Sequence, residues 1–146
     1  MSLAGKLIAF VGKQSARRFD EATRDPRRTQ TELLLGMLRR NADTEYGRRY
    51  NFASINSVAD YQKQVPLITY ADIQQDMERV AGGAKNVFTA EDPVMFAQTS
   101  GTTGDPKFVP VTPSSRGRAQ SDQMRTWMWQ AMKAHPDIFD GRHDSD

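Results

Sequence analysis

Cysteine is absent from the 146 residues, and histidine occurs only at His135 and His143. Without cysteine the chain can form neither a disulfide nor a thiolate metal site. Two histidines exclude a histidine-rich zinc site and leave few candidates for a Ser-His-Asp triad. Long apolar runs are also missing. Leu7–Val11 is the longest such run near the N-terminus, whereas a bilayer requires about 20 apolar residues. The sequence therefore predicts no membrane partner and no structural metal.

The N-terminus carries no targeting signal that we can identify. Leu7–Val11 runs directly into Lys13, Arg17 and Arg18, whereas a secretory signal has a longer apolar core and a small-residue cleavage site. The lack of cysteine fits a reducing compartment. We therefore expect a cytoplasmic protein.

Blocks of like charge are also missing, although the charge is unevenly distributed. Residues 1–50 carry 11 basic and 6 acidic side chains, and residues 51–146 carry 9 and 12. A basic N-terminal part can bind nucleic acid or an anionic surface. Because acids are scattered among the basic residues, we instead expect a solvated, arginine-rich helical surface and no nucleic-acid partner. A basic nucleic-acid-binding helical domain is the weakest alternative.

The first half of the chain reads as mainly helical. Apolar residues at helical spacing predict an amphipathic helix over residues 3–22, with Leu3, Leu7, Phe10, Val11 and Phe19 on its apolar face. A possible capping box from Thr29 to Glu32 predicts a second helix that starts at Thr29 and ends near Asn41. Its predicted buried stripe is Leu33, Leu34, Met37 and Leu38.

Residues 44–56 are predicted to form a loop anchored by Tyr46-Gly47 and Tyr50-Asn51-Phe52. Ser57 is predicted to cap a short helix that runs through Gln64. Residues 65–68 are predicted to be extended, since the residue before a proline avoids the helical region. Thr69 is predicted to cap a helix over residues 70–81, with Asp72 at its third position. Gly82-Gly83 would end that helix.

After residue 92 the pattern changes to short apolar runs that suit buried strands, at 94–97 and 108–111. A last helix is predicted to open at Thr112-Pro113-Ser114-Ser115, because proline is tolerated in the first turn of a helix. It is predicted to end at His135-Pro136. The predicted apolar face of this helix is Met124, Trp127, Met128, Ala131 and Met132, with Trp127 in the core.

The stretch between the two predicted strands, Thr99–Lys107, carries the chemistry. It contains Gly101 and Gly104, the hydroxyls of Thr99, Ser100, Thr102 and Thr103, and the Lys107 cation. Glycines let the backbone approach a ligand closely, and consecutive amides in such a turn can form a nest for an anion. These are the parts needed to hold a polyphosphate. The spacing matches neither a Walker A loop nor a dinucleotide fingerprint, so from spacing alone a polar hairpin turn is an equal alternative.

The full string Ser-Gly-Thr-Thr-Gly-Asp-Pro-Lys resembles the phosphate-binding loop of the adenylate-forming superfamily, which includes acyl-CoA synthetases and luciferases. The flanks, Phe96–Thr99 and Phe108–Thr112, narrow the resemblance to the auxin-responsive Gretchen Hagen 3 family of acyl-acid amido synthetases. Four upstream stretches agree with that family. They are Asn41 with Thr44–Gly47, Phe52–Ile55, Tyr61–Tyr70 and Gly82-Gly83. The resemblance covers roughly residues 30–140.

The resemblance implies a ligase that activates a small carboxylic acid with ATP and Mg and then forms an amide with an amine or amino acid. It implies that Thr99, Ser100, Gly101, Thr102, Thr103, Gly104 and Lys107 bind the nucleotide phosphates. For Lys107 two roles stay open, a phosphate contact or a restraint on the loop. No catalytic residue can be assigned.

The predicted fold class is α/β, with a helix-rich N-terminal part (1–92) leading into the first strands of an incomplete, acyl-CoA-synthetase-like adenylation domain (93–146). Family members are much longer, so we expect a truncated or frame-shifted chain that is inactive in isolation and able to self-associate through bare strand edges. A non-enzymatic helical interaction module that retains an anion-binding turn is the alternative.

Overall fold

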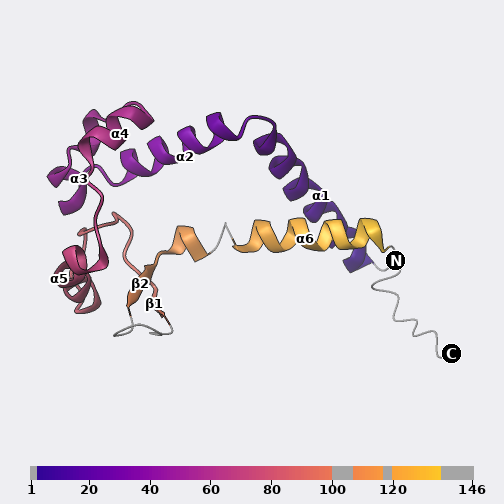
Figure 1. The fold of residues 1–146 in the computed structure, drawn as a ribbon. Helices are drawn as coiled ribbons and strands as arrows, with labels where there is room; N and C mark the ends of the chain where they lie inside the picture. Colours follow the sequence, from indigo (N-terminus) through magenta and orange to yellow (C-terminus); the bar gives the residue numbers. More distant parts are fainter. Residues whose placement is uncertain (1–2, 100–106, 117–119, 136–146) are drawn as a thin grey trace. The chain divides into compact units, whose positions relative to one another are not determined.

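The computed structural model of the chain describes residues 3–99, 107–116 and 120–135 (Figure 1). The chain forms two compact units. The first is Met1–Pro26 with Ser114–Asp146, and the second is Arg27–Pro113. Each is described separately below. The predicted domain boundary between residues 92 and 93 stays a prediction.

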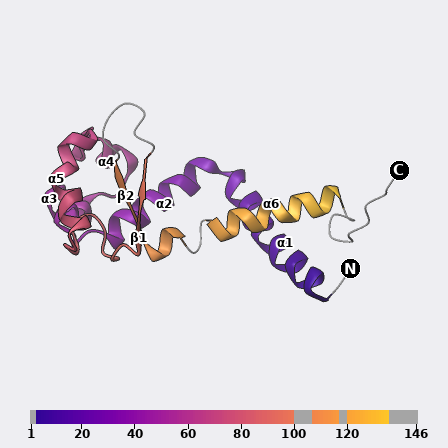
Figure 2. The same ribbon diagram turned by 90° about the horizontal axis from the view of Figure 1, so that it is seen from below.

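The first unit is built on α1 (Leu3–Arg24) and α6 (Gln120–Ala134), which lie side by side (Figures 1 and 2). Small residues of α1 make this close approach possible. Ser15 and Ala16 are buried, and a Cβ atom added at Gly12 would lie 3.0 Å from both the Arg125 carbonyl oxygen and the Trp129 Cβ. The Ser15 hydroxyl also donates a hydrogen bond of 3.3 Å to the Asp122 carboxylate.

The predicted helix over residues 3–22 is confirmed and runs two residues further, but most of its predicted apolar face is not buried. Leu7, Phe10 and Phe19 are all more than half exposed. Within the described part of this unit α6 is the element that packs on α1, and it covers the small-residue face rather than the bulky one. The core position predicted for Trp127 is wrong, since that side chain is 61% exposed, whereas Met132 of the same predicted face is buried. Met124 of the same predicted face is also exposed.

The second unit contains four α-helices and a short 3₁₀ helix among its described residues. They are α2 (Pro26–Arg40), α3 (Glu45–Arg49), η1 (Phe52–Ser54), α4 (Val58–Gln64) and α5 (Tyr70–Ala81).

Helix α2 begins three residues earlier than predicted. Its first residue is Pro26, because proline has no N–H to leave unpaired at a helix start and its φ already suits a helix. The predicted cap, Thr29, therefore lies inside the helix. The buried stripe is also shifted. Leu34, Leu35 and Leu38 face the core, whereas Leu33 and Met37 are exposed.

The core of this unit is centred on Leu38, Phe52 and Ile55. Tyr46 packs edge-on to Tyr50 and Phe52, with ring centroids 4.7 and 6.0 Å away. The anchor role predicted for these aromatic residues is confirmed, but the prediction of a plain loop over 44–56 is wrong, since α3 and η1 lie within it. A helix of this length has too few residues to show a periodic apolar pattern.

Helices α4 and α5 have the predicted bounds. The Ser57 hydroxyl accepts a hydrogen bond of 3.0 Å from the Asp60 backbone N–H, as expected of an N-cap. Gly82 is the C-cap of α5, and the left-handed backbone follows at Gly83, with φ of 97°. This is a conformation that glycine adopts without strain.

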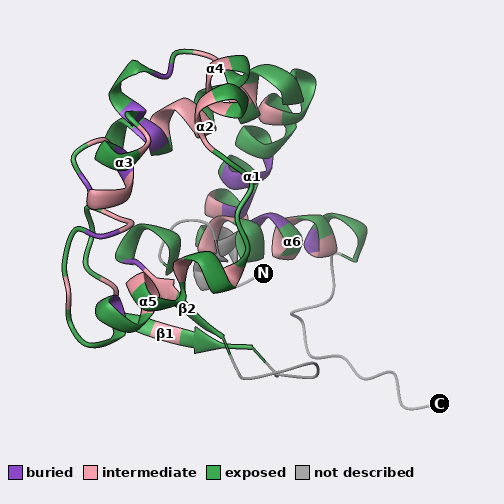
Figure 3. Ribbon diagram, turned by 60° about the vertical axis from the view of Figure 1, so that its left-hand side comes forward, coloured by how far each residue is buried: buried purple, intermediate pink, exposed green. Residues whose placement is uncertain are grey.

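The strands β1 (Met95–Gln98) and β2 (Phe108–Val111) pair antiparallel, from Met95 opposite Val111 to Gln98 opposite Phe108 (Figure 2). The predicted bounds of β2 are confirmed and β1 is displaced by one residue, although the Val94 N–H still bonds to the Val111 carbonyl at 2.9 Å. The prediction that these strands are buried is wrong, since neither contains a buried residue. Most of β1 is exposed (Figure 3). Beyond β2, residues 113–116 are helical and α6 starts at Gln120, so the predicted last helix is described in two pieces.

Candidate functional site

The two residues that flank the predicted phosphate-binding loop are bonded to each other. The Thr99 backbone N–H donates to the Lys107 carbonyl at 3.1 Å, and the Lys107 N–H donates to the Thr99 hydroxyl oxygen at 3.1 Å. Thr99 and Lys107 therefore join the two strands at the base of the segment that connects them. The other predicted phosphate-binding residues, Ser100, Gly101, Thr102, Thr103 and Gly104, lie outside the described residues.

A side chain from helix α5 holds the start of β2 from its other side. The Tyr70 hydroxyl accepts a hydrogen bond of 3.2 Å from the Phe108 backbone N–H. The Lys107 Nζ lies 5.5 Å from the centroid of the Tyr70 ring, within the range of a cation–π interaction. Lys107 forms no ion pair with any described carboxylate. Its charge is therefore offset by a ring rather than by a fixed anion.

The position of Tyr70 follows from the N-terminus of α5. Tyr70 is the first residue of the helix, directly after the N-cap Thr69. The Asp72 carboxylate accepts hydrogen bonds from the Thr69 backbone N–H at 2.6 Å and from its hydroxyl at 2.7 Å. These bonds, the side-chain one first, lower the pKa of Asp72, because they favour its charged form. The capping box thus fixes the turn from which the Tyr70 ring projects.

A hollow of about 530 Å³ lies between α5 and the start of β2. It is lined by Thr69, Tyr70, Ala71, Gln74, Glu78, Lys107 and Phe108. The lining combines two aromatic rings with one cation and one carboxylate, and the Glu78 carboxylate is engaged by the Gln74 amide at 3.0 Å. The Lys107 ammonium is the charged group of this wall that no described side chain neutralises.

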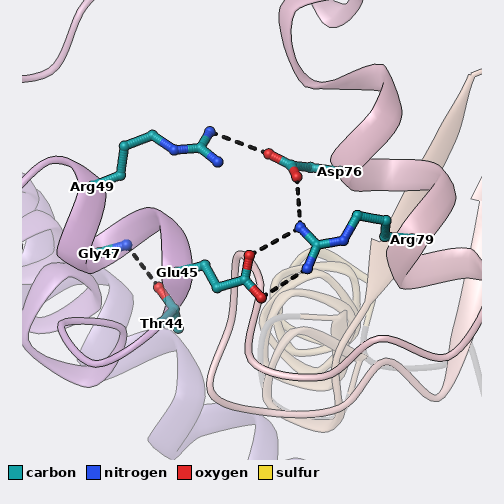
Figure 4. Close-up of polar contacts among 6 residues, drawn as sticks. All are labelled: Thr44, Glu45, Gly47, Arg49, Asp76 and Arg79. Atoms are coloured by element: carbon teal, nitrogen blue, oxygen red, sulfur yellow. Dashed lines mark hydrogen bonds and ion pairs between the residues drawn. The ribbon is translucent and has the colours of Figure 1, made fainter.

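Helix α5 is tied to α3 by a network of charged side chains (Figure 4). Arg79 donates to both carboxylate oxygens of Glu45 at 2.9 Å and to Asp76 at 2.9 Å, and Arg49 reaches Asp76 at 3.2 Å. The hydrogen bond from Arg79 is the main cause that lowers the pKa of Glu45, and the same contact raises the pKa of Arg79. The network links the helix that carries Tyr70 to the aromatic cluster around Tyr46.

The start of α3 is fixed by a fully buried threonine. The Thr44 hydroxyl accepts a hydrogen bond of 2.8 Å from the Gly47 N–H and donates one of 2.7 Å to the Asn41 carbonyl. A Cβ atom at Gly47 would lie 2.0 Å from that same carbonyl oxygen. The Asn41 side chain in turn accepts a hydrogen bond of 3.0 Å from the Ala90 N–H. Asn41, Thr44 and Gly47, which the family resemblance had singled out, are structural in this unit.

No group of His, Asp or Glu side chains suited to a metal ion occurs within the described residues. We therefore assign no magnesium ligand to the described part of the chain. No helix among residues 3–99, 107–116 and 120–135 is long and apolar enough to cross a bilayer.

Sequence reasoning missed the contribution of Tyr70 and the pairing of Glu45 with Arg79. The partners are 38 and 34 positions apart, so no local spacing indicates them. The one available signal for Tyr70 was its place directly after a predicted N-cap, which fixes the direction of its side chain.

Comparison with known proteins identifies the family. The model of the GH3 family N-terminal domain matches residues 15–144. A probable indole-3-acetic acid-amido synthetase, GH3.1 of Arabidopsis thaliana, is 34% identical over 109 residues, covering 73% of this chain and 18% of the relative. Indole-3-acetic acid-amido synthetase GH3.5 of the same plant is 33% identical over 93 residues, or 63% of this chain and 15% of the relative. A probable indole-3-acetic acid-amido synthetase of Oryza sativa subsp. japonica, GH3.12, is 36% identical over 86 residues, or 58% and 14%.

The chain thus spans less than a fifth of the length of these relatives. The match nevertheless includes both strands, the segment between them and every described helix of the second unit. The chain belongs to the GH3 family, and its residues 15–144 match the N-terminal domain of that family.

Proposed function

We propose that this chain is the N-terminal segment of an ATP-dependent acyl-acid amido synthetase, a ligase of the adenylate-forming superfamily. In this proposal residues 99–107 hold the phosphates of ATP. The observation that carries it is the string Ser100–Lys107 in a GH3-family chain, between two strands whose ends are joined by the Thr99–Lys107 bonds.

The proposed reaction has two steps. An oxygen of the acid's carboxylate attacks the α-phosphorus of ATP, so that a new P–O bond forms and the bond to the β-phosphate breaks, releasing pyrophosphate. The nitrogen of an amine or amino acid then attacks the acyl carbon, the bond to AMP breaks, and the amine loses a proton. Both steps conserve oxidation state, so no redox cofactor is required.

The loop contributes electrostatic stabilisation. Negative charge moves onto the leaving pyrophosphate in the first step, and N–H and hydroxyl donors aimed at that charge lower the barrier. The hydroxyls of Ser100, Thr102 and Thr103 and the amides of Gly101 and Gly104 are the proposed donors. Magnesium, bound with ATP as the counter-ion of its phosphates, would supply further charge neutralisation there. The Lys107 ammonium, which no described carboxylate neutralises, suits an anionic ligand.

Two substrate classes follow from the relatives. Their names specify indole-3-acetic acid and amide formation, so a small carboxylic acid and an amine or amino acid are the proposed reactants. Indole-3-acetic acid is the first acid to test.

The test replaces the matching segment of the Arabidopsis thaliana GH3.5 relative with residues 27–113 of this chain, the second compact unit. We expect exchange of pyrophosphate into ATP that depends on indole-3-acetic acid, and its loss on Gly101→Ala. The matched control is Gly36→Ala, in α2, where an added Cβ meets only the end of the flexible Arg40 side chain at 3.5 Å.

A folded chimera without exchange activity would contradict the proposal. It would favour the alternative, a non-enzymatic interaction module that retains an anion-binding turn. Activity that Gly101→Ala leaves unchanged would instead show that the loop is a structural turn.

A further inference from the structure

We propose that Tyr70 is a positioning residue that sets the Lys107 ammonium for contact with a phosphate group. The inference rests on the proposed function of residues 99–107. It adds a residue from outside the loop and from a different element, helix α5.

The backbone of Lys107 is held on its β1 side by Thr99. Both its N–H and its carbonyl are bonded to that residue at 3.1 Å. The next N–H along the chain, that of Phe108, is bonded to the Tyr70 hydroxyl at 3.2 Å. The start of β2 is therefore fixed between Thr99 and Tyr70. With its backbone fixed, Lys107 retains only the rotational freedom of its side chain.

The Tyr70 ring limits that remaining freedom. The Nζ atom lies 5.5 Å from the ring centroid, where the negative face of the ring attracts a cation. A ring offsets a positive charge without supplying a carboxylate that would bind it, so the N–H donors of the ammonium that point away from the ring stay available to an anion. A carboxylate in the same place would neutralise the cation and compete with phosphate.

Tyr70 is itself well placed to serve as this support. It is half-buried, and it begins a helix whose first turn is fixed by the Thr69–Asp72 hydrogen bonds of 2.6 and 2.7 Å. The helix is fixed further along by the Arg79–Glu45 contacts. The hollow between α5 and β2 leaves room for a ligand beside Lys107.

The experiment compares Tyr70→Phe, which keeps the ring, with Tyr70→Leu, which removes it, in the 146-residue chain. Lys107→Met identifies the Lys107 signals by NMR. The control is Tyr61→Phe, whose ring packs against the Leu38 cluster instead. We expect the ring to shift the Lys107 side-chain protons in the unsubstituted chain and in Tyr70→Phe, and this shift to vanish in Tyr70→Leu. Hydrogen exchange of the Phe108 amide should be faster in Tyr70→Phe, because this variant lacks the hydroxyl that accepts the Phe108 N–H.

The binding readout is a titration with inorganic pyrophosphate. We expect Tyr70→Leu to weaken binding roughly two- to fivefold, the range for a cation–π contact at an exposed site. In the Lys107→Met background the same substitution should have no further effect, because Tyr70 acts through Lys107. Thermal unfolding of each variant shows whether the fold is retained.

Equal weakening by Tyr70→Leu in both backgrounds would overturn the inference, as would an unchanged Lys107 proton shift. If the unsubstituted chain shows the effect of the Tyr70 ring on the Lys107 protons but no saturable pyrophosphate binding, the proposed function is wrong. The proposed role of Tyr70 in phosphate contact is then wrong as well. Saturable binding that is insensitive to Tyr70→Leu overturns this inference alone.

Discussion

Arg79 in α5 donates a hydrogen bond to each carboxylate oxygen of Glu45 in α3, both at 2.9 Å (Figure 4). A guanidinium that meets a carboxylate in this forked way gains directionality as well as charge attraction. Asp76 extends the contact, since it accepts from Arg79 and from Arg49. The pair therefore fixes the orientation of α5, and α5 carries the Tyr70 ring to the start of β2.

Removing the Arg79 guanidinium should destabilise the second unit. We expect Arg79→Met to lower the melting temperature more than Arg28→Met does, because Arg79 serves two carboxylates on two helices, whereas Arg28 pairs with Glu32 one turn along α2. Exposed pairs of the second kind contribute little. Thermal unfolding of both variants checks the ranking. Equal effects would mean that the α3–α5 contact adds nothing to stability.

Acid should weaken the start of α5 through Asp72. Its pKa is lowered in the folded chain from the ordinary value of 3.8, chiefly by the Thr69 side chain and then by the Thr69 backbone. A lowered folded pKa gives stability that is fully present above the unfolded value and is lost as the pH falls through the folded one. We expect Asp72→Asn to be less stable at pH 7 and to lose less stability than the parent chain below pH 3.8. Denaturant unfolding against pH measures this.

The control for that series is Asp20→Asn, because the Asp20 carboxylate makes no hydrogen bond within the described residues. It should keep the acid dependence of the parent chain. A parental acid dependence in Asp72→Asn would contradict the assignment to Asp72.

Gly47 should not tolerate a side chain. A Cβ atom there would lie 2.0 Å from the Asn41 carbonyl oxygen and 2.7 Å from that of Ala42, both backbone atoms. We expect Gly47→Ala to destabilise the unit by about 1–3 kcal/mol, as overpacking does. Gly36→Ala is the matched control and should stabilise α2 by about 0.5–1 kcal/mol, because alanine is the better helix former. Chemical denaturation distinguishes the opposite signs.

The Thr44 hydroxyl should contribute more to stability than the Thr31 hydroxyl. Thr44→Val keeps the shape but leaves the buried Gly47 N–H without its acceptor, which should cost about 1–3 kcal/mol. Thr31→Val is the control, since that hydroxyl donates to the Arg27 carbonyl on an exposed helix surface and should change stability by less than about 0.5 kcal/mol. A Thr44→Val variant as stable as Thr31→Val would exclude the proposed capping contribution.

Local sequence signals predicted the structure wherever neighbours in the chain decide it. Ser57 and Thr69 were identified as caps because the hydrogen-bond partner of each lies three residues away. Ser57 accepts from the Asp60 N–H, and the Thr69 N–H donates to the Asp72 carboxylate. Gly82-Gly83 ended α5 for a similarly local reason. The error at Thr29 has the same origin, since a capping-box pattern competed with Pro26 and the proline determined the helix start.

Contacts between segments that lie far apart in the chain could not be predicted from the sequence. The face that α1 buries depends on α6, about a hundred positions later, and α6 packs on Gly12, Ser15 and Ala16 rather than on the bulky apolar residues. In the candidate site, too, the local feature was predictable and the distant contact was not. Its composition was evident from Ser100–Lys107, but the supporting Tyr70 hydroxyl was not, because only the folded chain brings it to Phe108.

The last prediction concerns the loop hydroxyls in the GH3.5 chimera. A hydroxyl aimed at the leaving pyrophosphate stabilises charge that develops in the transition state. Removing one such donor typically costs about 2.7–4 kcal/mol of barrier, or roughly 10²–10³ in rate. We therefore expect Thr102→Ala or Thr103→Ala to lower pyrophosphate exchange by this factor, while the melting temperature changes little, since a turn threonine contributes within about 0.5 kcal/mol to stability.

The matched control is Thr112→Ala, because Thr112 lies just beyond β2, is buried, and is outside the predicted loop. It should affect stability rather than exchange in the folded protein. Exchange that stays normal in both loop variants, or falls only in step with the melting temperature, would show that Thr102 and Thr103 shape a turn and contact no phosphate.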